Sequence, residues 1–174
     1  AAHQVAIAYA ALMFMIPLSL HSATTIHVGH QLGRGDRPGG RNAGWAGIAM
    51  CGLVMAASSL VILAARAGIA ATFTADPQVL ALATSLLLFV AVFQIPDGLQ
   101  VGAAGALRGF KDARVPMLLN FTAYWLVGFP LAWWLGIRMG AGPDGIWSGL
   151  IAGLFTCAGL LIWRYRRISQ SSSR

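Results

Sequence analysis

Charged side chains are scarce in this sequence. Only 10% of its 174 residues are Asp, Glu, Lys or Arg, whereas 57% are hydrophobic and the mean hydropathy is +0.71. Soluble domains carry about 25% charged residues, so this balance excludes an ordinary soluble fold. The net charge of +7 does not indicate nucleic-acid binding, because no cluster of Lys and Arg lies on a soluble-looking domain. The composition indicates an integral membrane protein.

Cysteine is also rare, with only two residues in the chain. Cys51 and Cys157 both lie inside apolar runs, and no CxxC pair is present. The sequence therefore offers neither a cysteine metal site nor a redox motif, and both residues are predicted to be small, buried side chains.

Polar, Gly-bearing or Pro-bearing breaks divide the apolar sequence into five stretches. Each is long enough to cross a hydrocarbon layer of about 30 Å as a helix. Short segments of alternating hydrophobicity, which are typical of membrane β-strands, are absent from the sequence. The prediction is an all-α integral membrane protein with five transmembrane helices, at residues 3–28, 43–65, 78–106, 115–137 and 145–163.

Basic residues alternate between the two ends of these helices. The second and fourth connections hold only Arg66 and Arg138, whereas the other ends are rich in Arg and Lys: Arg34, Arg37, Arg41, Arg108, Lys111, Arg114, Arg164, Arg166, Arg167 and Arg174. The positive-inside rule predicts that these richer ends and the C-terminus are cytoplasmic. The N-terminus is then outside, and since the chain has neither an initiator Met nor a signal peptide, we expect it to be the end of a longer protein.

Asp97 is the acidic side chain set deep inside an apolar segment. It lies eleven residues before Arg108, roughly 16 Å along a helix and close to the membrane midplane. Charges at that depth are costly and usually line an ion or substrate path, although capping a broken helix or pairing with a neighbouring helix are alternatives. Pro96 predicts a kink that frees nearby carbonyl groups. Gln94 and Gln100 lie three residues on either side of Asp97, where they could line a cavity.

Two further polar residues share one face of the fourth predicted helix. Asn120 and Tyr124 are four residues apart, and they could line a cavity beside Asp97 or form hydrogen bonds across helices. His27 and His30 are three residues apart, but no carboxylate or Cys completes a metal site, so helix-end or interface roles are favoured. No metal site or cofactor is predicted.

Four ordered motifs resemble the C-terminal half of multidrug and toxic compound extrusion (MATE) transporters of the NorM-like type. These motifs are Ala1-Ala2-His3-Gln4-Val5-Ala6, Val28-Gly29-His30-Gln31-Leu32-Gly33, Gly105-Ala106-Leu107-Arg108-Gly109-Phe110-Lys111-Asp112 and Tyr124-Trp125-Leu126-Val127-Gly128-Phe129-Pro130. Together they span nearly the whole chain. The resemblance implies that residues 1–168 form helices eight to twelve, most of one six-helix lobe of a twelve-helix transporter, with a polar cytoplasmic tail at 169–174.

The resemblance also implies a function: export of organic cations and other drugs across a bacterial inner membrane, driven by inward flow of sodium ions or protons. Asp97 matches the tenth-helix carboxylate that couples cations in NorM-like members. Phe93 stands where sodium-coupled relatives often have a tyrosine, and the expected partner acid lies on the absent seventh helix, so the coupling ion stays open. The first lobe and that helix are the expected protein partners.

Two other function classes are alternatives to this interpretation. A flippase of lipids or lipid-linked saccharides belongs to the same broader superfamily, but flippases of anionic substrates are expected to carry cationic side chains at mid-membrane, where this sequence has none. An intramembrane enzyme would need a nucleophile with a base, or a second acid, at the depth of Asp97. Neither is present in the five helices, which favours a transporter.

Overall fold

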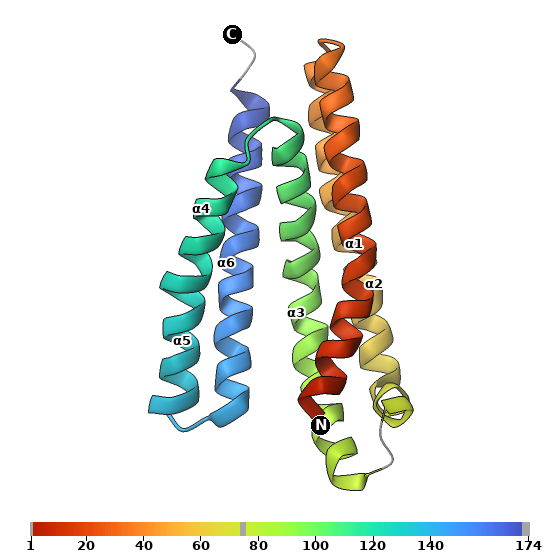
Figure 1. Ribbon diagram of the computed structural model, residues 1–174, viewed down its shortest axis with the longest axis vertical. Coiled ribbons are helices and arrows are strands. Elements are labelled where there is room, and N and C mark those ends of the chain that lie inside the picture. The colour runs from red at the N-terminus through yellow and green to blue at the C-terminus, as the bar shows by residue number, and fades with distance from the viewer. Residues whose placement is uncertain (1, 74–75, 172–174) are drawn as a thin grey trace.

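The computed structural model describes residues 2–73 and 76–171, and these residues form a bundle of long helices (Figure 1). Five helical segments of the described chain are long and apolar enough to cross a membrane, which confirms the predicted all-α fold with five membrane spans. Four of these spans lie in single helices: α1 (Ala2–Gly33), α2 (Arg37–Phe73), α3 (Pro77–Gly109) and α6 (Gly142–Gln170). The other span consists of four shorter elements that follow one another without a break.

That composite span runs from Arg114 to Arg138 and was predicted as one ordinary helix. The structure instead alternates α-helix with π-helix, in which each hydrogen bond reaches one residue further: α4 (Arg114–Thr122), η1 (Ala123–Gly128), α5 (Phe129–Trp133) and η2 (Trp134–Arg138). Pro130 and Gly128 fall within this stretch, and such residues loosen the regular hydrogen-bond ladder. Hydropathy alone does not distinguish the two helix types.

Most helices extend beyond the predicted apolar stretches. The hydrophobic run marks only the part that crosses the hydrocarbon layer, whereas backbone hydrogen bonding continues into polar residues at the ends. Asp76 fixes the start of α3, because its side chain accepts hydrogen bonds from the backbone N–H groups of Gln78 and Val79. At the other end of the chain, α6 continues to Gln170, into the predicted tail. Residues 1 and 172–174, which belong to the predicted first motif and the tail, lie outside the described residues.

α3 occupies the centre of the bundle, packed against α1, α2 and α6 (Figure 1). Small residues make these approaches possible: a Cβ atom on Gly98 would lie 2.7 Å from the Cys51 carbonyl oxygen of α2, and one on Gly105 would lie 2.7 Å from the His21 carbonyl oxygen of α1. On the other side of the bundle, α5 and the π-helical segments pack against α6. Cys51 and Cys157 are both buried and free, as predicted.

Tyr165 of α6 joins three helices at the arginine-rich end of the bundle. Its side chain is fully buried, its ring makes edge contacts with Trp45 of α2 and Phe110 after α3, and its hydroxyl donates a 2.8 Å hydrogen bond to the Arg41 carbonyl oxygen. Gly44 leaves room for the hydroxyl, because a Cβ atom there would overlap it.

Replacing Tyr165 with Phe removes this hydrogen bond and leaves the ring contacts in place. We expect the full-length protein to lose about 1 kcal/mol of unfolding free energy, the typical net contribution of one such bond. Thermal unfolding of the purified protein in detergent measures the change. Tyr9→Phe is the control, since the Tyr9 hydroxyl makes a longer, 3.3 Å contact with Ser58. A loss for Tyr165→Phe no larger than for the control would contradict the assignment.

Candidate functional site

Asp97 lies on α3 and is 6% exposed. Among the described residues it is the only buried acidic side chain. The side chain is therefore buried within the helix bundle itself. A carboxylate in such surroundings requires partners, because an unpaired buried charge is strongly unfavourable.

A chain of hydrogen bonds connects Asp97 to the neighbouring helical span. The Gln100 side-chain Nε2 donates a 3.0 Å hydrogen bond to Asp97 Oδ1, and the Tyr124 hydroxyl donates a 3.2 Å bond to Gln100 Oε1. Gln100 thus uses its donor toward the Asp97 carboxyl group and its acceptor toward the phenol. Three of the residues singled out in the sequence form one polar chain from α3 to η1.

Asn120 is not a member of this chain. Its Oδ1 atom accepts a 2.8 Å hydrogen bond from the Cys157 thiol, which links α4 to α6. Of the two alternatives for Asn120 and Tyr124, the structure places Asn120 in a hydrogen bond across helices. The role of Cys157 as its partner has no signal in the sequence beyond the burial of a small side chain.

Gln94 has an unusual environment. It is 1% exposed, and neither its side-chain nitrogen nor its side-chain oxygen has a hydrogen-bond partner in the described structure. Buried amides are nearly always paired, so an unpaired one calls for a physical explanation. Gln94 is three residues before Asp97 on α3, and side chains at that spacing are neighbours on a helix surface.

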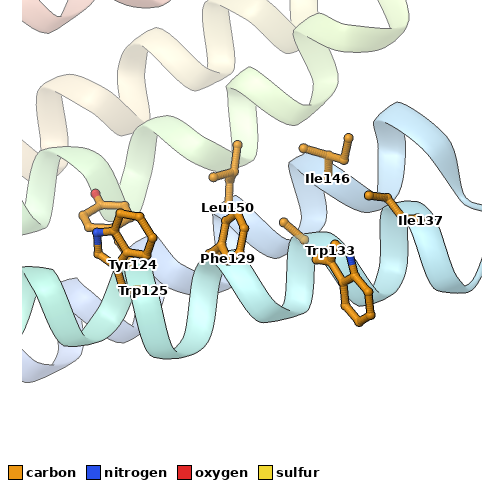
Figure 2. A pocket seen from close by; sticks show the side chains of 8 residues that line it. Tyr124, Trp125, Phe129, Trp133, Ile137, Ile146 and Leu150 are labelled. Carbon is orange, nitrogen blue, oxygen red and sulfur yellow. The ribbon is translucent and has the colours of Figure 1, made fainter.

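An apolar groove begins next to the Asp97 chain. It has a volume of about 440 Å³ and lies between the composite fourth span and α6, lined by Tyr124, Trp125, Phe129, Ala132, Trp133, Ile137, Ile146 and Leu150 (Figure 2). Tyr124 belongs to both features: its hydroxyl is in the polar chain and its ring lines the groove. The other predicted lining residues, Gln94, Gln100 and Asn120, do not line this groove.

Apart from Tyr124, the aromatic residues of the groove were not predicted as lining residues. Trp125, Phe129 and Trp133 are spaced four residues apart and are each at least half exposed in the structure. Four-residue spacing places side chains along one face of a helix, so this pattern was a signal available in the sequence.

His21 takes a structural position. His21 joins α1 to α3, with Nδ1 2.9 Å from the Val101 carbonyl oxygen and Nε2 3.3 Å from the Arg108 guanidinium. Within the described residues, no three His, Cys, Asp or Glu side chains are grouped as a metal site would require.

Comparison with known proteins identifies the family. The MatE family model matches residues 1–134. The probable multidrug resistance protein NorM of Xanthomonas campestris pv. campestris is 50% identical over 170 residues, covering 98% of this chain and 37% of that protein. The multidrug resistance protein PmpM of Pseudomonas aeruginosa is 45% identical over 172 residues, covering 96% of this chain and 36% of that protein. The chain therefore spans little more than a third of the length of these relatives.

Solved structures show the same fold. The crystal structure of the eukaryotic MATE transporter AtDTX14 superposes with a TM-score of 0.88 at 22% identity, covering 98% of this chain and 39% of that chain. An inward-facing structure of a multidrug resistance MATE family transporter of the MOP superfamily gives a TM-score of 0.85 at 18% identity, with 97% and 40% coverage. These likenesses establish the fold, and the family model that matches residues 1–134 establishes that this chain belongs to the MATE family.

Proposed function

We propose that the full-length protein exports amphipathic, often cationic drugs in exchange for sodium ions or protons, with Asp97 as the cation-coupling residue. The observation that carries the proposal is the burial of Asp97, the lone buried acidic side chain in the part of the chain that the structure describes, with Gln100 as its hydrogen-bond partner. Its other carboxylate oxygen, Oδ2, has no hydrogen bond among the described residues. That oxygen is available to a sodium ion or a proton.

Exchange of ion and drug requires a physical connection between the residue that binds the ion and the residues that bind the drug. The Asp97–Gln100–Tyr124 chain supplies such a connection, because Tyr124 also lines the aromatic groove. A cation at Asp97 would change the charge that Gln100 and Tyr124 face. Aromatic faces at the groove attract flat, apolar and cationic compounds, the expected drug class.

The orientation of the protein in the membrane also belongs to this proposal. The ends of α1, α3 and α6 and the starts of α2 and α4 carry most of the Arg and Lys residues, and these ends lie together at the top of Figure 1. We infer that this end faces the cytoplasm of a bacterial cell, in line with the positive-inside rule. Drug would then leave toward the opposite end.

The direct experiment measures drug efflux from vesicles that contain the full-length protein. A sodium gradient and a proton gradient are imposed separately, and a vesicle without protein is the control. We expect one of the two gradients to drive efflux, because a single membrane-buried carboxylate can bind either ion. Absence of efflux under both gradients would contradict the proposal and leave a flippase activity as the next candidate to test.

A further inference from the structure

Two buried prolines lie at the same depth in neighbouring helices. α1 and α3 run in parallel, since His21 contacts the Val101 carbonyl and Thr25 donates to the Gly105 carbonyl, both pairs 80 residues apart. The same spacing places Pro17 of α1 level with Asp97 of α3. A second contact agrees with this register: the Cys51 thiol is 3.9 Å from the Pro17 carbonyl oxygen, and Cys51 also faces Gly98. Pro17 and Pro96 are both less than 2% exposed.

Each proline removes one backbone donor from its helix. Pro17 cannot bond to the Met13 carbonyl, and Pro96 cannot bond to the Val92 carbonyl, so both carbonyls lose their usual partner four residues on. Met13 lies one turn before Pro17, and by the register of the two helices this turn is level with Gln94. The packing of Tyr9 and Ala10 of α1 against the buried cluster that includes Val90 supports that alignment.

The unpaired side-chain amide of Gln94 therefore lies level with the Met13 carbonyl of α1, which has lost its usual backbone donor at Pro17. The side-chain oxygen and nitrogen of Gln94 have no hydrogen-bond partner among the described residues, and the Asp97 carboxylate is three residues away on the same helix. Carboxamide and backbone carbonyl oxygens are neutral ligands of the kind that coordinate sodium in broken membrane helices. A proton site does not need them, because a protonated carboxyl group holds its proton without further oxygen ligands. One carboxylate balances the charge of one monovalent cation.

We propose that Gln94 is a ligand of an alkali-metal ion bound at Asp97, with its side-chain oxygen directed to the ion and the Met13 carbonyl adjacent. The inference rests on the proposed cation-coupling role of Asp97 and adds a second side chain and the ion class. It makes Gln94 the residue that distinguishes sodium binding from simple protonation at this site.

Equilibrium binding of radiolabelled Na⁺ to the purified full-length protein tests the inference. Gln94→Leu removes the oxygen at similar volume, and we expect the dissociation constant for Na⁺ to rise on the order of tenfold or more. Gln94→Glu keeps an oxygen ligand and should bind Na⁺ at least as tightly as the wild type. Ser59→Ala is the matched control: Ser59 is also buried and bonds α2 to the Ala91 carbonyl of α3, but it supplies no ligand.

The outcomes separate the two levels of the proposal. Unchanged Na⁺ affinity in Gln94→Leu, or efflux by the wild type that is driven only by protons without Na⁺ binding, would overturn the role of Gln94 while Asp97 coupling stands. No efflux under either gradient would overturn the coupling function itself. If Gln94→Leu does not fold, Gln94→Glu decides the question. Glutamate keeps a side-chain oxygen that can bind Na⁺ but loses the amide N–H group. A folded Gln94→Glu protein that binds Na⁺ supports the ligand role, and one that does not bind Na⁺ contradicts it.

Discussion

Asp97→Asn in the full-length protein is expected to insert and fold normally but to lose ion-driven drug efflux. The substitution preserves the shape of the side chain and its acceptor for Gln100, while it removes the charge that attracts the coupling ion. Removing one partner of a buried charge pair costs about 2 to 5 kcal/mol, so efflux should fall on the order of 100-fold. The measurement is drug efflux from vesicles under whichever gradient drives the wild type.

The matched control is Asp144→Asn, which makes the same chemical change at an exposed acid in the first turn of α6. It should retain wild-type efflux, since its carboxylate is solvated and remote in sequence from the buried chain. Equal protein amounts in the membrane must be verified for both variants. Asp97→Asn protein that still pumps drug at the wild-type rate would end the coupling assignment.

Gly149→Ala is expected to be the most damaging glycine-to-alanine change, because its Cβ atom would lie closest to backbone atoms. A Cβ atom on Gly149 of α6 would overlap the backbone nitrogen and Cα of Ala132 in α5, so the two helices would have to separate. Backbone atoms cannot move aside as a flexible side chain can. We expect a loss of about 3 kcal/mol or more of unfolding free energy, at the upper end of overpacking effects. The loss of stability is measured by thermal unfolding of the full-length protein and by the yield of folded protein in detergent.

Gly159→Ala provides the control on the same helix. A Cβ atom at Gly159 would have no other heavy atom within 4 Å, so the substitution adds helix propensity without a clash. It should leave the melting temperature unchanged or slightly higher. A Gly149→Ala protein as stable as Gly159→Ala would show that α5 and α6 are not in the close contact described.

Local chemistry explains how much of the site could be predicted. Asp97 was evident because an acidic residue within an apolar run has few structural explanations, and Gln100 followed from its spacing on the same helix. The hydrogen bond from Tyr124 to Gln100 crosses between two spans, 24 residues apart in the sequence, and no local pattern contains it. For the same reason the Asn120–Cys157 pair was not foreseen, since it joins residues 37 apart.

Hydropathy and charge patterning by themselves determined that this is a helical membrane protein with five spans, because the hydrocarbon layer imposes a length and an apolar composition on every segment that crosses it. They also located Asp97, the one carboxylate that is buried in the described part of the chain. Only the tertiary structure decided which side chains meet. It placed Pro17 level with Asp97, left Gln94 without a hydrogen-bond partner among the described residues and made the fourth span partly π-helical. Those features depend on the register between packed helices, which steric fit between distant residues sets and which sequence periodicity does not encode.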